Sequence, residues 1–206
     1  RYIWYDLQRE AILKQSRDVA KNGKNAVHSL QRGDLKRCDS LLEACTKDAD
    51  RIDAEIVAKC PGLRSSLAYP VEEVMEALAF RAFLQESKVP SLAEIQQKVG
   101  NFKVCSTEYL GALSDLTGEV LRQGIRSAQS MDEEKFGKCL SLVQGVHTGF
   151  CELKSMSPHL RKKANAVGGS LTKMEAVKFE QVLLKTGRSK TAGAIDLSGP
   201  GEGEAE

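Results

Sequence analysis

The stretch YLGALSDLTGEVLR, residues 109–122, predicts an amphipathic helix, because its apolar side chains recur at helical spacing along one face. Asp115 and Glu119 are four residues apart, so both carboxylates leave one side of that helix, and Arg122 follows about a turn later. A solvated outer face is the ordinary explanation of such a charged strip. Small residues flank the strip and would let another chain or a ligand approach closely: Gly111, Ser114 and Gly118.

A second stretch, VEEVMEALAFRAFL at residues 71–84, adds two further acids. Between positions 74 and 84 every residue is apolar except Glu76 and Arg81, which indicates a helix that is buried on nearly all sides. Glu73 lies one turn before Glu76. A carboxylate on a central helix is costly unless it is paired or holds a metal. Two helices that each carry such a pair are the parts of a four-carboxylate site, and oxygen ligands without a nearby imidazole favour Mg²⁺ or Mn²⁺.

These residues resemble a known family, the translin family, in its catalytic, TRAX-like branch. YLGALSDLTGEVLR is similar to that branch's signature helix, and EVMEALAF, residues 73–80, is similar to its other acidic helix. Residues 13–32 and 158–179 resemble the first and last helices more loosely, so the similarity covers about residues 6–190. The resemblance implies metal-dependent endonucleolytic cleavage of single-stranded RNA. Four positions match the family's acidic set, with Asp115 expected to be indispensable: Glu73, Glu76, Asp115 and Glu119.

The resemblance also implies an assembly and a setting. Such subunits form a closed octameric shell with nucleic acid inside, either with a translin-like partner or as a homo-oligomer, in the cytoplasm and nucleus. The implied roles are passenger-strand removal in RNA silencing and processing of transfer-RNA fragments. Arg122 is expected either to meet a phosphate or to pair with an acid on its own helix. Arg17, Lys21 and Lys24 form a basic face that is either solvated or in contact with single-stranded RNA or DNA.

Three alternatives stand beside the nuclease. One is a translin-like subunit that binds nucleic acid without cutting it. Another is a structural adaptor whose acids are paired with Arg81, Arg122 or Arg126. A di-iron bundle would need Glu-x-x-His motifs, which the chain lacks. The residue three positions before each histidine is not glutamate. It is Asn25 for His28, Gln144 for His147 and Met156 for His159.

Composition favours one all-α domain. The 206 residues are 5% aromatic, with Leu, Ala and Val supplying most of the apolar share, which suits helices packed by aliphatic ridges. The formal net charge is +2, and residues 191–206 hold four acids and no Lys or Arg. We therefore expect a helical domain over residues 1–190, modestly basic, and a disordered, acidic, Gly-rich tail over 191–206.

Periodicity and helix-end signals predict about seven helices in one bundle. Their expected ranges are 3–30, 35–58, 63–86 with an interruption at Pro70, 91–99, 107–127, 133–154 and 158–184. Expected caps are Asp34, Ser91 with Glu94, Thr107, Asp132, and Ser157 before Pro158. The six scattered cysteines form no CxxC pair, which predicts reduced and mostly buried thiols. No apolar run approaches the roughly 18 residues of a membrane span.

Overall fold

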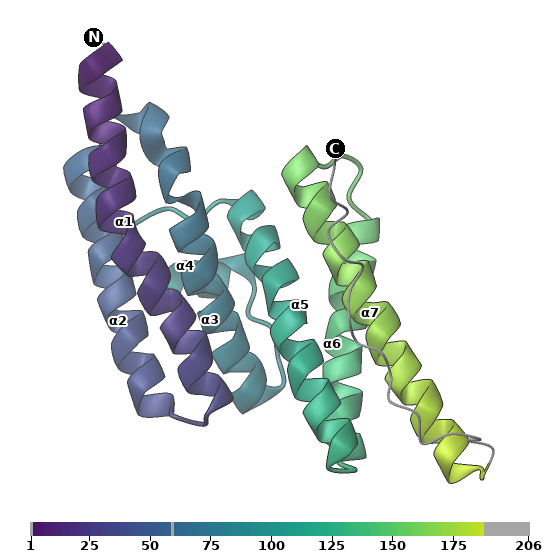
Figure 1. Cartoon of the computed structure of the whole chain (residues 1–206). Coiled ribbons are helices and arrows are strands. Elements are labelled where there is room, and N and C mark those ends of the chain that lie inside the picture. Colours follow the sequence, from purple (N-terminus) through teal and green to yellow (C-terminus); the bar gives the residue numbers. More distant parts are fainter. Residues whose placement is uncertain (1, 59, 188–206) are drawn as a thin grey trace, which may run out of the picture.

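Seven α-helices run through the residues that the computed structural model describes, 2–58 and 60–187, and no strand occurs among them (Figure 1). The helices are α1 (Tyr2–Gln31), α2 (Leu35–Ile52), α3 (Ala68–Glu86), α4 (Leu92–Lys98), α5 (Ser106–Gln129), α6 (Glu133–Cys151) and α7 (Pro158–Lys185). The all-α prediction is thus confirmed. The tail expected to be disordered, 191–206, lies outside the described residues.

Two helices hold the bundle together. In Figure 1, α1, α2 and α3 lie side by side, α6 and α7 form a second group, and α5 runs between the groups. Helix α3 contacts α1, α2 and α5, whereas α5 contacts α3, α6 and α7. The contact between α3 and α5 therefore joins the two halves of the molecule.

Helix α3 is buried, as its sequence predicted. Every residue from 70 to 80 is buried, including Glu72, Glu73 and Glu76. Its apolar members belong to one core shared with α1, α2, α5, α6 and α7. Each large aliphatic or aromatic side chain buried there contributes about 1.5–3 kcal/mol. A smaller core, around Phe150, Leu160 and Val167, joins α6 to the start of α7.

Most predicted helix ends are confirmed. Three cap side chains accept a hydrogen bond from the first helical turn, and Ser91 forms a capping box with Glu94. The three caps that accept a hydrogen bond from the first helical turn are Asp34, Asp132 and Ser157. Pro70 does not break α3, because it sits in the first turn, where a backbone N–H has no partner within the helix. A separate 3₁₀ segment, Pro61–Leu67, precedes that helix.

Three predicted boundaries were wrong. The start of α5 is set by Cys105 and not by Thr107, because the Glu108 carboxylate accepts a hydrogen bond from the Cys105 N–H at 2.9 Å. Arg64 holds Glu108 in place with two hydrogen bonds of 2.7 and 3.0 Å. Helix α2 gives way to a π-helical turn, Asp53–Val57, where the α pattern was expected to continue to 58. Helix α6 ends at Cys151, short of the predicted residue 154.

The cysteines follow the prediction. Cys38, Cys45, Cys60 and Cys139 are buried free thiols, while Cys105 and Cys151 are exposed free thiols. None of the described helices combines the length and the hydrophobicity that a bilayer crossing requires.

Gly23 sets the distance between α1 and α3. A Cβ atom built on Gly23 would lie 3.0 Å from the Glu73 Cβ and 3.1 Å from its carbonyl carbon. Because the second neighbour is backbone, no side-chain rotation can relieve the contact. Gly23 lowers the helix propensity of α1, and its missing side chain is what lets α3 approach α1 closely.

We predict that Gly23→Ala destabilises the protein by about 1–3 kcal/mol, although alanine favours a helix by about 1 kcal/mol. The matched control is Gly118→Ala on α5, where an added Cβ meets nothing within 4 Å. That control should be neutral or slightly stabilising. Urea unfolding of both variants measures the difference, and a Gly23→Ala protein as stable as the control would contradict the close packing.

Candidate metal and nucleic-acid site

The acids predicted from sequence are gathered where α3 meets α5. Glu73, Glu76 and Glu119 are only 7–8% exposed, and the Asp115 side chain is 41% exposed. The charges of Asp115, Glu73 and Glu119 all act on Glu76 and raise its pKa. The two carboxylate pairs are thus close enough for their charges to interact, and their joint binding of a metal stays a prediction.

Glu76 is the uncompensated acid of this group. Burial, reinforced by the neighbouring carboxylates, raises the pKa of Glu76 to about 8. Within the described part of the chain, no hydrogen bond or ion pair reaches its carboxyl group. At neutral pH this side chain is therefore mainly protonated in the metal-free protein.

Lys163 of α7 places an ammonium group between the two acidic helices. Its Nζ donates hydrogen bonds to Asp115 Oδ2 at 2.6 Å and to Glu72 Oε2 at 2.7 Å, and lies 3.3 Å from the Gly111 carbonyl oxygen. Ser114 Oγ donates to the Lys163 carbonyl at 3.0 Å. Burial alone would lower the pKa of Lys163, but the bonds to Asp115 and Glu72 outweigh it and raise that pKa.

The small residues of α5 are explained by this contact. An added Cβ on Gly111 would lie 2.5 Å from the Glu72 carboxyl carbon, so any side chain there would displace the carboxylate from its present position. The close approach expected from sequence is therefore made by α3 and α7 of the same chain. At Gly118 the helix surface stays open.

Glu73 and Glu119 each have partners of their own. Lys24 Nζ lies 3.7 Å from Glu73 Oε1. Burial raises the pKa of Glu73, and the Tyr69 hydroxyl and Lys24 offset part of that rise. Glu119 accepts hydrogen bonds from the Arg122 guanidinium and from the Gln31 amide of α1.

The structure thus shows Arg122 paired with an acid of its own helix, which was one of its two expected roles. Its side chain is still 62% exposed, so it can also meet a ligand. Arg81, expected by the adaptor hypothesis to pair with the site acids, pairs instead with Asp39 of α2 at 2.6 Å.

Of the basic residues predicted on α1, Lys24 lies at the acid cluster. Lys21 is exposed about one turn before it, and Arg17 about two turns before it, on the same face of the helix. These three residues form a line of positive charge that ends beside Glu73. Their contact with nucleic acid stays a prediction.

The donor chemistry fits a hard divalent cation, because the group consists of carboxylate oxygens. In this conformation, no three Asp, Glu, His or Cys side chains of the described residues are arranged as a ready metal site. Lys163, Lys24 and Arg122 instead neutralise Asp115, Glu73 and Glu119. Metal binding would therefore require these carboxylates to exchange an internal cation for the metal.

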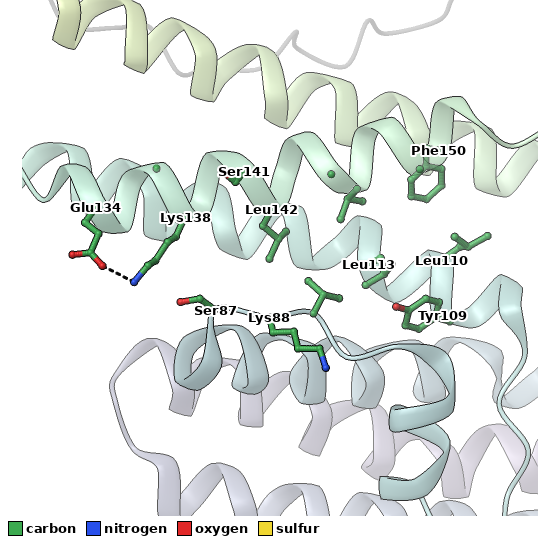
Figure 2. A pocket seen from close by; sticks show the side chains of 15 residues that line it. Ser87, Lys88, Tyr109, Leu110, Leu113, Glu134, Lys138, Ser141, Leu142 and Phe150 are labelled. Atoms are coloured by element: carbon green, nitrogen blue, oxygen red, sulfur yellow. Dashed lines mark hydrogen bonds and ion pairs between the residues drawn. The ribbon is translucent and has the colours of Figure 1, made fainter.

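A large apolar cavity lies elsewhere. A groove of about 860 Å³ separates α6 from α5 and from the connection between α3 and α4, and none of the four acids lines it. Figure 2 shows apolar side chains facing this groove, with the Glu134–Lys138 pair near one end. Its lining includes Tyr109, Leu110, Leu113, Leu142 and Phe150. Because this groove is mainly apolar and holds none of the four acids, it does not suit metal-dependent phosphate chemistry.

Sequence reasoning missed three members of the site. Glu72 stood next to two predicted acids, and only its place on a helix buried all round could have signalled its role. Lys163 looked like one of several solvated cations on the last helix, because its partners are 48 and 91 residues away. Tyr69 precedes the acidic stretch by one turn and had no distinguishing pattern.

Fold and site together define an all-helical protein with a buried carboxylate cluster between two central helices. The sequence profile of the Translin family matches residues 7–184. The chain therefore belongs to the translin family, as its two acidic helices indicated.

The curated relatives are distant. The translin-associated proteins X of Rattus norvegicus and Mus musculus are each 21% identical over 203 residues, which cover 81% of this chain and 69% of theirs. Among solved structures, the crystal structure of apo-NeC3PO has a TM-score of 0.74 at 23% identity, covering 87% of this chain and 92% of that one. The AfC3PO–duplex RNA complex has a TM-score of 0.74 at 16% identity, covering 91% and 94%. At these identities the likeness establishes the fold.

We predict that Lys163→Met destabilises the protein by about 2–4 kcal/mol, because it strands two partly buried carboxylates while keeping the apolar stem. The neighbouring exposed residue supplies the control, Lys162→Met, which should change stability by less than about 0.5 kcal/mol. Urea unfolding at pH 7 without metal compares them. Equal stability of the two variants would show that the Lys163 ion pairs do not hold α7.

Glu76 predicts a pH dependence of stability. Folding raises the pKa of Glu76 from the ordinary value of 4.5 to about 8. The contribution of Glu76 to the free energy of unfolding is therefore complete below pH 4.5 and is lost as pH rises through 8. Glu76→Gln mimics the protonated form. In EDTA it should match the wild type below about pH 4.5 and exceed it by about 4 kcal/mol at pH 9. Unfolding curves across this range test it, with exposed Glu86→Gln on the same helix as the control whose difference from wild type stays flat.

Proposed function

We propose that this chain is a subunit of a translin-type assembly that binds single-stranded RNA and cleaves it with Mg²⁺ or Mn²⁺. The observation that carries the proposal is the gathering of Glu73, Glu76, Asp115 and Glu119 at the contact between the two central helices. Glu76 there has no hydrogen-bond or ion-pair partner among the described residues, and the neighbouring carboxylates outweigh the Lys163 charge. A core position that would be more stable with a neutral side chain is typical of a functional site.

The relatives support RNA as the ligand class. One structural neighbour was solved as a complex with duplex RNA, and the curated relatives are named for their association with translin. This chain covers somewhat more than two thirds of those relatives' length, and its acids lie within the matched region. From these names we infer that this chain, too, binds nucleic acid and has a translin-like partner. We propose that the two assemble in a closed octameric shell.

The chain's own residues divide into two roles. Glu73, Glu76, Asp115 and Glu119 would supply oxygen ligands to the metal. A divalent cation bound there would neutralise phosphate charge and lower the pKa of a water molecule. Lys163, released from Asp115, stays beside Glu72 and keeps one positive charge at the site. On the exposed side, Lys24 and Arg122 are placed to meet the phosphates of an incoming strand.

A second candidate is an RNA-binding subunit that does not cut. One observation favours it: Glu73, Asp115 and Glu119 are already neutralised by cations of the chain itself. In such a subunit the ion pairs would be structural and the metal would be dispensable.

We predict that Asp115→Asn lowers Mg²⁺-dependent cleavage of labelled single-stranded RNA by on the order of 100-fold or more, because a metal ligand is lost. RNA affinity should be kept or slightly increased, since one negative charge near the phosphates is gone. The assay compares this chain alone and with a translin subunit, with Mg²⁺ and with EDTA. Exposed Glu86→Gln serves as the unchanged control.

A binding measurement separates the two candidates. If the acids hold metal, Mg²⁺ or Mn²⁺ should raise the melting temperature of the wild type and raise that of Asp115→Asn much less. Absence of both cleavage and metal-dependent stabilisation, with RNA binding intact, would favour the non-cutting subunit. RNA binding should weaken steeply with salt in either case, as phosphate contacts require.

A further inference from the structure

A second cavity adjoins the acid cluster. It has a volume of about 650 Å³ and lies where the starts of α3, α5 and α7 come together. Glu72 and Lys163 line it, and Lys163 also contacts Asp115, so the cavity and the acids share a wall. This volume falls within the range of ordinary small-molecule sites, about 300–1,000 Å³.

An exposed aromatic ring stands between the cavity and the acids. Tyr69 lines the cavity and is 53% exposed, although it lies in the first turn of the most buried helix. Lys24 Nζ lies 5.4 Å from the centre of the ring, and Lys24 also pairs with Glu73. Tyr69 is thus fixed beside the site while much of its surface is open to a ligand.

The charges of the cavity are already balanced. Arg64 is held by the Glu108 carboxylate, and the Lys163 ammonium by Glu72 and Asp115. A phosphate would gain little from cations that are engaged in this way. The remaining lining is largely apolar surface interrupted by the hydroxyl groups of Ser65, Thr107 and Ser157 and by the Cys105 thiol. The His159 imidazole also lines the cavity, with its Nε2 3.7 Å from Glu72 Oε1. This lining suits a flat, uncharged group with a polar edge.

We propose that this cavity is a nucleobase subsite, in which a base of the bound RNA stacks on Tyr69 while its phosphate lies at the acid cluster. The inference rests on the proposed function, because the acids supply the place for the phosphate. The subsite adds a contact to a base, whereas the rest of the proposed RNA-binding surface contacts only the charged phosphates. Stacking on an aromatic ring tolerates any base, whereas the hydroxyl groups can give a preference through the base edge.

The test uses a short single-stranded RNA carrying one 2-aminopurine, moved position by position, bound to the full chain with Ca²⁺ in place of Mg²⁺, so that a hard divalent cation remains available to the carboxylates while cleavage is suppressed. At one position, 2-aminopurine fluorescence should be quenched by stacking. Tyr69→Leu should remove that quenching and weaken binding about 5- to 100-fold, the equivalent of a stacking contact of about 1–3 kcal/mol. Tyr69→Phe, which keeps the ring, should retain most of both effects.

Two controls make the test specific. Phe179→Leu removes another exposed aromatic ring, 61% exposed on α7, and should leave binding unchanged. Replacing the quenched nucleotide by an abasic one should weaken binding to the wild type and leave binding to Tyr69→Leu unaltered. Melting temperatures confirm that each variant is folded.

The outcomes distinguish this inference from the function on which it rests. Wild-type affinity in folded Tyr69→Leu, or an abasic effect of equal size in both proteins, would overturn the subsite while RNA binding and cleavage by the wild type stand. If the wild type neither binds nor cuts RNA with Mg²⁺ and a translin subunit, the proposed function falls, and the base subsite falls with it.

Discussion

The structure depends on placing like charges inside a core and then neutralising them from other helices. Helix α3 is buried all round yet carries three carboxylates, and α5 adds two more on the facing side. The Lys163 ammonium, bonded to Glu72 and Asp115, ties α7 to both. Within one half, Lys24 of α1 pairs with Glu73, and Gln31 of α1 reaches across to Glu119 of α5. The acid cluster is therefore also where the two halves of the bundle are joined.

This arrangement couples stability to chemistry. Each internal cation stabilises an acid that would otherwise be costly to bury, and each occupies a position that a metal would need. A metal ion bound as proposed would have to enter by exchange, so its affinity would be reduced by the strength of the ion pairs that it displaces. The uncompensated Glu76 acts in the opposite direction, because its ionisation becomes favourable once a divalent charge is near.

Much of this was accessible from sequence. Helical periodicity and one-turn spacing identified α3 and α5, their acids and the burial of α3, because these properties are local and repeat along the chain. Lys163 could not be assigned, since its position depends on how α7 packs across α5. The cap at Cys105 was missed for a similar reason: Glu108 is held by Arg64, which comes from a distant segment. Pairings across helices follow from packing, which one sequence does not display.

The distribution of thiols makes the site accessible to chemical labelling without mutagenesis. Of the six free cysteines, only Cys105 and Cys151 are exposed in the described structure. Cys105 lines the cavity beside the acids, whereas Cys151 lies on α6 next to His147. A maleimide dye on Cys105 would stand at the entrance of the cavity, and a second dye on Cys151 would serve as a reference on another helix. The native chain thus carries two attachment points from which distances within its assembly can be measured.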